Sequence, residues 1–356
     1  MSSTKIITTI GPSSLNSEIL TFFKNHSVEY ARLNFSHSTS DWHIDAGKKC
    51  RQVGLKLLID LGGPKIRLGV LESDIEIKKR IKIAFELTKE GIKYPFYLEA
   101  NEIVLPLAID LALVLVAGQE ILVDDGKLRL IVDKVEDGRI FCTVVVGGVF
   151  KSRKGVNLPK SSLKMSFLTD RDKNMITDTL AHLKPDMVAC SFIKTKDDVD
   201  EIKTFLKKII TEQNIDPSYF PEICCKLEQR ELFIADNLKD VVEACDLVMI
   251  ARGDLALEVT PVHLVLPFLQ EKIKQVCKRL NKPFVIATQI LESMIDCPVP
   301  TRAEVSDLYR AVMLDKADYV MLSGESAIGH YPTQCVELMD DMIIKGEGLR
   351  KDILRQ

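Results

Sequence analysis

No stretch of this sequence approaches the roughly 18 consecutive apolar residues that are needed to span a lipid bilayer. The amino terminus lacks a signal-peptide pattern, and the nine cysteines show neither zinc-site spacing nor a disulfide framework. The formal net charge is only −3, so neither positive nor negative residues are in large excess. We therefore expect no nucleic-acid or membrane partner. Gly118 to Gly126 lacks the spacing of a dinucleotide-binding loop. We therefore expect a cytoplasmic globular protein with reduced, mostly buried cysteines.

Short apolar runs recur along the chain, and amphipathic helical segments separate them. Eight runs are predicted to be strands: Ile6–Ile10, Tyr30–Phe35, Lys56–Asp60, Met187–Phe192, Ile223–Leu227, Leu247–Ala251, Phe284–Thr288 and Tyr319–Leu322. Eight alternating β and α units are the number that closes a (β/α)₈ barrel, so we predict an α/β fold of the TIM-barrel class. Trp42, His43 and His182 fall at helical or core positions, where we expect a structural role.

The interval between the third and fourth predicted strands is too long for one helix. From residue 70 to residue 156, short strand-like runs alternate with turn signals such as Asp124-Asp125-Gly126. We therefore predict that residues 70–156 form a small inserted β-barrel lid domain, and that residues 1–69 and 157–356 form the (β/α)₈ barrel. We expect no C-terminal domain. A lid in this place could close over the carboxyl-end face of the barrel and exclude water during a reaction.

Charged residues gather where the predicted strands end, which is where (β/α)₈ barrels carry their active sites. The cations are Arg32, Arg67, Lys226 and Arg252, and the carboxylates are Asp60, Glu228 and Asp254. A single charged residue at a strand end is explained equally well by contact of that strand end with solvent. Solvent contact does not explain why charged residues recur at the same end of the barrel strands. Together they are typical of a site that binds a phosphorylated, carboxylated substrate through a divalent metal.

Motifs at these strand ends carry a family resemblance that covers nearly the whole chain. The matching segments are Thr4–Ser14, Ala31–His37, Gly63–Arg67, Val123–Gly126, Lys154–Pro159, Ala251–Leu255, Ala287–Met294, Pro300–Glu304 and Met321–Glu325. In this order they resemble the pyruvate kinase family. The resemblance implies transfer of a phosphoryl group between phosphoenolpyruvate and ADP, giving pyruvate and ATP in glycolysis, with Mg²⁺ or Mn²⁺. Because the family's C-terminal domain has no match, we expect no sugar-phosphate activation, and a monomer or barrel-mediated homodimer rather than a tetramer.

Matching positions also imply roles for single residues. Lys226 would stabilise the transferring phosphoryl group and the enolate oxygen, Glu228 and Asp254 would hold Mg²⁺, and Thr288 would belong to the proton-transfer network. Arg32 and Arg67 would be catalytic phosphate ligands, and the substrate would also contact Ser191, Arg252, Gly253, Asp254 and Thr288. The nucleotide would be bound by Thr9, Pro12, Arg32, His37 and Lys154, and Asp125 would belong to the lid. A monovalent-cation site would be formed by Asn34, Ser36, Asp60 and the Leu61 carbonyl.

The sequence departs from the family on the nucleotide and cation side. Lys65 stands where potassium-dependent members carry Glu, and the resemblance implies that its ammonium replaces potassium. Gly62 and Ile328 stand where the family has Lys, and His330 stands where it has Asp. Two alternatives therefore stay open. The chain could be a metal-dependent lyase that acts on a pyruvate enolate, or a non-catalytic binding or regulatory protein with the same fold.

Overall fold

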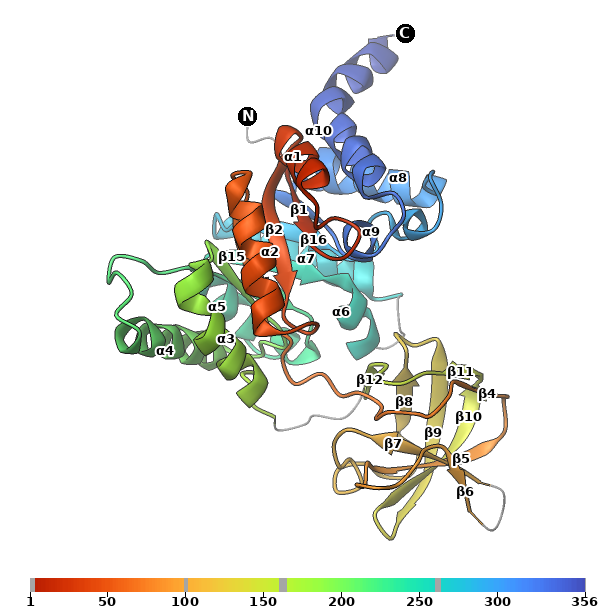
Figure 1. Cartoon of the computed structure of the whole chain (residues 1–356). Coiled ribbons are helices and arrows are strands. Elements are labelled where there is room, and N and C mark those ends of the chain that lie inside the picture. Colours follow the sequence, from red (N-terminus) through yellow and green to blue (C-terminus); the bar gives the residue numbers. More distant parts are fainter. Residues whose placement is uncertain (1–3, 99–101, 160–164, 260–263, 356) are drawn as a thin grey trace. The chain divides into compact units, whose positions relative to one another are not determined.

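The computed structural model describes residues 4–98, 102–159, 165–259 and 264–355 (Figure 1). The chain folds into two compact units. The first comprises Met1–Gly63, Phe167–Leu255 and Pro267–Gln356, and the second comprises Pro64–Ser166 and Ala256–Leu266. The predicted domain boundaries, at 69/70 and 156/157, lie several residues away from these divisions.

The first unit is a closed barrel of eight parallel strands, in the order β1-β17-β16-β15-β14-β13-β3-β2, and the predicted fold class is confirmed. The strands are β1 (Lys5–Thr9), β2 (Val28–Asn34), β3 (Lys56–Asp60), β13 (Met187–Cys190), β14 (Glu222–Leu227), β15 (Leu247–Ala251), β16 (Phe284–Ala287) and β17 (Tyr319–Leu322). Because helices cover the outside and side chains fill the inside, both faces of each strand are apolar. Ile7, Leu58, Met249 and Val285 belong to the core cluster formed by the barrel strands.

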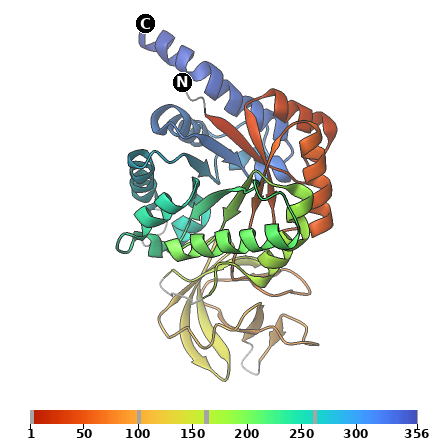
Figure 2. The ribbon, with the colours of Figure 1, turned by 90° about the vertical axis from the view of Figure 1, so that its left-hand side faces the viewer.

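Helices lie around the barrel strands of the first unit, as Figure 2 shows. The helices of the chain are α1 (Ser17–Asn25), α2 (Ser40–Gln52), α3 (Asp170–Leu183), α4 (Lys196–Glu212), η1 (Arg230–Phe233), α5 (Asn237–Ala244), α6 (Arg252–Glu258), α7 (Leu266–Arg279), η2 (Glu292–Ile295), α8 (Arg302–Tyr309), the π-helical turn η3 (Arg310–Asp315), α9 (Gly324–Ala327) and α10 (Pro332–Arg355). The end of α6, from Ala256, and the first residue of α7, Leu266, belong to the second unit. Capping boxes begin α3, α4 and α8, where a Thr and an acidic residue three positions later bond to each other's backbone N–H groups. Each box therefore marks where a loop at the carboxyl-end face gives way to its helix.

The predicted inserted β domain is confirmed in the second unit as a seven-stranded mixed sheet, in the order β12-β8-β9-β10-β5-β7-β6, with a two-stranded ribbon of β11 and β4. The strands are β4 (Ile75–Ile77), β5 (Lys82–Leu87), β6 (Phe96–Tyr97), β7 (Ile103–Leu107), β8 (Glu120–Val123), β9 (Leu128–Glu136), β10 (Arg139–Val146), β11 (Gly148–Phe150) and β12 (Val156–Asn157). Phe85, Leu105, Leu130 and Phe150 belong to a separate hydrophobic core in this unit. Within the described ranges, no helix has the length and apolarity to cross a membrane.

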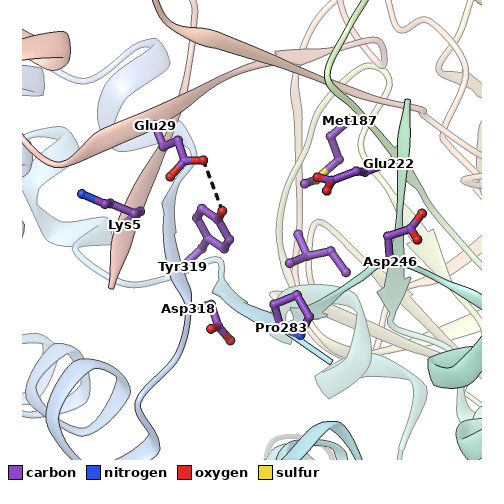
Figure 3. Close-up of a pocket in the computed structure, with 9 residues that line it drawn as sticks. Lys5, Glu29, Met187, Glu222, Asp246, Pro283, Asp318 and Tyr319 are labelled. Carbon is purple, nitrogen blue, oxygen red and sulfur yellow. Dashed lines mark hydrogen bonds between the residues drawn. The ribbon is translucent and has the colours of Figure 1, made fainter. Parts of the chain in front are cut away.

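A pocket of about 350 Å³ lies at the amino ends of the barrel strands, and Figure 3 shows its acidic lining. Two of its carboxylates tie neighbouring strands together. Asp246 Oδ2 accepts the Ile223 N–H at 2.9 Å, and Asp318 Oδ2 accepts the Phe284 N–H at 2.9 Å. Tyr319 donates to Glu29 across the pocket, with an O···O distance of 3.4 Å. These contacts join the starts of the strands, as expected for the stabilising face of a barrel.

Candidate active site

Lys226 stands at the carboxyl end of β14, where residues from three strands meet. Side chains alternate along a strand, so Lys226 follows Cys224 on the same face, and Cys224 belongs to the barrel core cluster. The Lys226 Nζ atom lies 2.7 Å from Ser191 Oγ, 3.4 Å from Asp60 Oδ1 and 3.6 Å from Glu228 Oε2. The Lys226 side chain is 14% exposed, so part of it remains open to solvent.

Asp60 links this ammonium to a second cation. Arg32 donates from Nε to Asp60 Oδ2 at 2.7 Å and from Nη1 to Thr9 Oγ1 at 2.7 Å. The Thr9 hydroxyl in turn donates to the Leu322 carbonyl at 2.8 Å. Because Arg32 and Asp60 are both buried, the end of β2 is held rigidly between β1 and β3.

Burial and charge compete in setting the ionisation of these groups. Burial by itself lowers the pKa of Lys226, but the Asp60 and Glu228 carboxylates outweigh it and hold the pKa above its usual value. Burial by itself raises the pKa of Asp60, yet Lys226 and Arg32 hold that pKa below its usual value. Lys226 is therefore a charged ammonium, and Asp60 is an ionised carboxylate, at neutral pH.

Among Lys226, Asp60 and Glu228, Glu228 is the residue whose buried charge is not fully compensated by its neighbours. Its Oε1 accepts the Phe192 N–H at 2.8 Å, whereas its buried Oε2 has no hydrogen-bond partner in the described part of the chain and faces the Lys226 ammonium. Burial and the nearby Asp254 carboxylate together raise the pKa of Glu228 to about 7, against the opposing effect of Lys226. Asp254 also influences the pKa of Lys226, so all three charges interact.

This donor set fits a divalent cation. A second positive charge beside Glu228 and Asp254 would compensate the buried Oε2 and the repulsion between the carboxylates. No group of three or more His, Cys, Asp or Glu side chains is arranged as a metal site among the residues that the structure describes. Mg²⁺ is usually held by one or two protein carboxylates together with water and substrate oxygens, so a site for it does not require a larger cluster.

Thr288 follows β16 and has a strained backbone with φ +68°. Its hydroxyl oxygen accepts the Gly253 N–H at 2.9 Å. Arg252 was predicted to bind substrate, but each guanidinium nitrogen already donates to a protein oxygen. The acceptors are the carbonyls of Ala287, Thr288 and Gln289 and the Asp307 carboxylate. Its contacts are therefore those of a residue that holds the Thr288 loop.

A second pocket, of about 300 Å³, adjoins Arg32 at the carboxyl ends of β1 and β2. It is lined by Thr9, Ile10, Gly11, Pro12, Arg32, Asn34, His37, Ser38, Trp42, His43, Ser323, Gly324, Ala327 and Ile328. Four of the five predicted nucleotide ligands are therefore brought together here, and the fifth, Lys154, lies in the second unit. Gly11 permits close approach of two loops, because a Cβ at this position would lie 2.4 Å from the Ala327 carbonyl oxygen.

The comparisons with known proteins show the family of the chain. The family description "Pyruvate kinase, barrel domain" matches residues 1–336. The chain belongs to the pyruvate kinase family. It is 36% identical over 350 residues to a pyruvate kinase of Agrobacterium vitis, covering 96% of this chain and 68% of that protein. It is also 36% identical over 346 residues to pyruvate kinase 2 of Synechocystis, covering 94% of this chain and 55% of that protein.

A solved structure gives the same result for the fold. The crystal structure of a pyruvate kinase from Cryptosporidium parvum superimposes with a TM-score of 0.84 at 32% identity, covering 97% of this chain and 69% of that one. The chain thus spans between 55% and 69% of the length of these three pyruvate kinases.

The oxygens of the monovalent-cation site expected in the pyruvate kinase family mostly meet donors of the protein. Asn34 Oδ1 accepts the Ser36 N–H at 3.1 Å, and the Leu61 carbonyl accepts the Ser191 hydroxyl at 2.6 Å. Asp60 faces Arg32 and Lys226. The side chains of Asn34 and Asp60 and the Leu61 carbonyl therefore each already accept at least one donor of the protein.

The remaining predicted residues lie in the second unit. Lys65 Nζ is 4.0 Å from Asp125 Oδ1, and Arg67 Nη1 donates to the Arg153 carbonyl at 3.1 Å. Lys154 Nζ is 2.8 Å from Asp124 Oδ1. The first pair brings the predicted potassium substitute close to the predicted lid residue, Asp125.

Sequence reasoning on this pyruvate kinase family member missed Asp172. Its Oδ1 accepts the Gly62 N–H at 2.9 Å, and its Oδ2 accepts the Gly63 N–H at 3.2 Å, so it fixes the loop that follows Asp60. The Thr169-x-x-Asp172 capping box was a usable signal, because it places an acidic side chain at the start of a helix on the carboxyl-end face.

Trp42 and His43 lie in α2, as expected from the sequence, and both also line the pocket beside Arg32. His43 is also buried, and its Nε2 lies 2.9 Å from the His37 carbonyl oxygen. The sequence could have indicated this position, because Trp42 and His43 lie in the first turn of the helix that follows β2, and that turn is at the carboxyl-end face of the barrel.

Proposed function

We propose that this chain transfers a phosphoryl group between phosphoenolpyruvate and ADP, and so forms pyruvate and ATP. The observation that carries the proposal is the charged Lys226 ammonium, held within 3.6 Å of both Asp60 and Glu228 at the carboxyl end of the barrel. Membership of the pyruvate kinase family supports the same reaction.

Lys226 acts as a fixed positive charge in this reaction. Its raised pKa keeps it protonated, so it stabilises the negative charge that develops on the transferring phosphoryl group and on the enolate oxygen. Ser191 and Asp60 orient the ammonium. Glu228 and Asp254 would hold a Mg²⁺ or Mn²⁺ ion, which would supply further stabilisation of negative charge on the substrate.

Thr288 completes the reaction at the enolate carbon. Its hydroxyl oxygen accepts the Gly253 N–H, so the hydroxyl proton stays available for donation. The Ser191, Gly253 and Asp254 region is the proposed substrate site.

Nucleotide binding is assigned to the pocket that contains Thr9, Pro12, Arg32 and His37. We further assign Arg67, Asp125 and Lys154 of the second unit to phosphate binding and to a lid. Lys65 is assigned as the substitute for potassium, which makes turnover independent of that ion. Ile328 is 62% exposed and offers no charge to a nucleotide phosphate, so ADP is expected to bind through the remaining cations.

The first prediction tests the reaction itself. With phosphoenolpyruvate, ADP and Mg²⁺, the protein is expected to form pyruvate and ATP at the same rate with and without potassium. Lys226→Met is expected to lower kcat about a thousandfold, the size of effect seen when one preorganised stabilising group is removed. Calorimetry with ADP measures the nucleotide step separately.

Failure would take distinguishable forms. Exchange of pyruvate methyl protons that ADP does not affect, with no ATP formed, would point to an enolate-forming lyase. Binding of phosphoenolpyruvate without any turnover would point to a non-catalytic member of the family. If the Lys226→Met variant turned over as fast as the wild type, the catalytic role proposed for the Lys226 ammonium would be rejected.

A further inference from the structure

Two consecutive residues after β16 adopt a backbone conformation that their side chains disfavour. Thr288 has φ +68° and Gln289 has φ +54°. A β-branched residue is a rare occupant of the left-handed region. Such a conformation is energetically costly and persists only where surrounding contacts enforce it. The contacts around Thr288 therefore identify what enforces it.

Arg252 supplies most of these contacts. Its Nη2 donates to the Thr288 carbonyl at 2.6 Å and to the Gln289 carbonyl at 3.2 Å. Its Nε lies 3.3 Å from the Ala287 carbonyl oxygen and 3.2 Å from that of Thr288. The guanidinium thus binds three consecutive carbonyls of the loop. Only a planar group with several donors can do this, and a lysine ammonium cannot reproduce it.

Asp307 on α8 fixes the guanidinium from its other side. Its Oδ2 lies 2.5 Å from Arg252 Nη1. The Arg252 side chain is 8% exposed and that of Asp307 is 33% exposed, so the ion pair is partly shielded from water. Charge-assisted hydrogen bonds of this kind are about twice as strong as neutral ones. The pair therefore connects α8 to the backbone of Thr288.

The same loop is held at the Thr288 side chain. Gly253, the neighbour of Arg252, donates its N–H to Thr288 Oγ1 at 2.9 Å. This bond occupies the hydroxyl as an acceptor, directs its proton elsewhere, and stabilises negative charge on the oxygen when the proton leaves. Arg252 fixes the backbone of Thr288, and Gly253 fixes its hydroxyl.

We propose that Arg252 and Asp307 are positioning residues that aim the Thr288 hydroxyl at the enolate carbon. This inference rests on the proposed phosphoryl-transfer function. In the protonation step, the C–H bond of the methyl group forms as the Thr288 O–H bond breaks. The threonine oxygen then takes a proton from a water molecule, whose hydroxide passes to solvent. The pair acts on protonation and not on phosphoryl transfer.

The test measures these two steps separately. ATP formation from phosphoenolpyruvate and ADP reports phosphoryl transfer. Exchange of pyruvate methyl protons with deuterated water, followed by proton NMR with Mg²⁺ and ATP present, reports protonation. Asp307→Asn and Arg252→Lys are each expected to slow exchange about tenfold more than ATP formation. That ratio corresponds to the loss of one hydrogen bond of about 1.4 kcal/mol.

A double-mutant cycle decides whether the pair acts through Thr288. Adding Asp307→Asn to Thr288→Ala is expected to cause no further loss of exchange. Asp307→Glu, which keeps the charge, is expected to restore the wild-type ratio of the two rates. Additive losses in the double mutant, or equal losses of exchange and ATP formation, would overturn the inference.

A matched control separates positioning from stability. The buried ion pair of Lys274 and Asp315 has an N···O distance of 2.8 Å and makes no contact with Thr288. Asp315→Asn is expected to lower the melting temperature without changing the ratio of the two rates. A wild type that neither forms ATP nor exchanges protons would reject the proposed function. An active wild type with additive losses would reject only the positioning pair.

Discussion

At the scale of single residues, the chemistry depends on a lysine that is largely removed from water and still charged. Removing an ammonium from water normally favours the neutral form. Here the Asp60 and Glu228 carboxylates reverse that effect and raise the pKa of Lys226. Ser191 supplies the shortest contact, because its oxygen accepts from Lys226 Nζ at 2.7 Å while its hydroxyl donates to the Leu61 carbonyl at 2.6 Å. One hydroxyl therefore links the ammonium to the backbone after β3.

Ser191→Ala tests this link. The change removes a hydrogen bond to a charged group, which contributes about 1.5–3 kcal/mol. If the bond orients Lys226 for the transition state, kcat is expected to fall roughly 10–100-fold. Steady-state kinetics and thermal unfolding should be measured together.

The control for Ser191→Ala is Thr179→Val, which removes a buried hydroxyl that donates only to the Met175 carbonyl within α3. It is expected to change stability and leave kcat unaltered. Equal kcat for Ser191→Ala and the wild type would show that the remaining carboxylates orient Lys226 without the serine.

At the scale of elements, the first turn of α3 contributes a residue, Asp172, to the candidate active site. Two helices, α3 and α4, begin with the same Thr-x-x-Asp capping box. In α3 the capping Asp172 also binds the Gly62 and Gly63 N–H groups. Among the described residues, the corresponding Asp198 of α4 accepts hydrogen bonds from the nearby N–H groups of Lys194 and Thr195 and from the Thr195 hydroxyl. The two aspartates therefore share one capping role, and only Asp172 reaches the loop after Asp60.

Asp172→Asn and Asp198→Asn form a matched pair for this difference. Both are expected to lose about 1 kcal/mol of stability, the typical value of a cap. Only Asp172→Asn is expected to lower kcat/KM, by about tenfold, because the Gly62–Gly63 loop loses its anchor. Denaturant unfolding and kinetics on the same preparations provide the measurement. A similar loss of kcat/KM in both variants would mean that Asp172 acts only as a cap.

At the scale of the whole molecule, the chain divides into two units with separate cores. The second unit contains a buried carboxylate, Glu86, bound by the Tyr94 hydroxyl at 2.8 Å, Arg139 Nε at 2.9 Å and Lys89 Nζ at 3.0 Å. Burial raises the pKa of Glu86, but these three groups together hold it below its usual value. The carboxylate therefore stabilises the folded unit above its unfolded pKa, and this stabilisation is lost as the pH falls through its folded pKa.

We expect two transitions in calorimetric unfolding, because each unit has its own core. Glu86→Gln is expected to lower only the transition of the second unit, by about 2 kcal/mol or roughly 10 °C at neutral pH. The difference from the wild type should shrink below about pH 4, where the wild-type carboxylate becomes protonated.

Glu72→Gln is the control in the same unit. Its partner Lys93 Nζ is 2.8 Å away, and both side chains are more than half exposed, so the change should have almost no effect. A single transition that Glu86→Gln shifts as a whole would show that the two units unfold as one.

The sequence by itself determined the eight barrel strands, the inserted β domain and the gathering of Lys226, Glu228 and Asp254 at one end. These features follow from local rules. The residue patterns that predict strands and turns each extend over only a few consecutive residues. In a closed barrel, all the parallel strands end on the same face. The residues that terminate those strands could therefore be placed together without coordinates.

Only the tertiary structure decided what each side chain does at that face. Arg252 binds protein carbonyls and Asp307, which lies 55 residues away in sequence, while Asp172 reaches back 110 residues to Gly62. Trp42 and His43 lie on a helix, as predicted, but the sequence did not show that they also line a pocket. The physical reason is that a side chain's partner depends on packing between distant segments, and the period of a strand or helix carries no information about that packing.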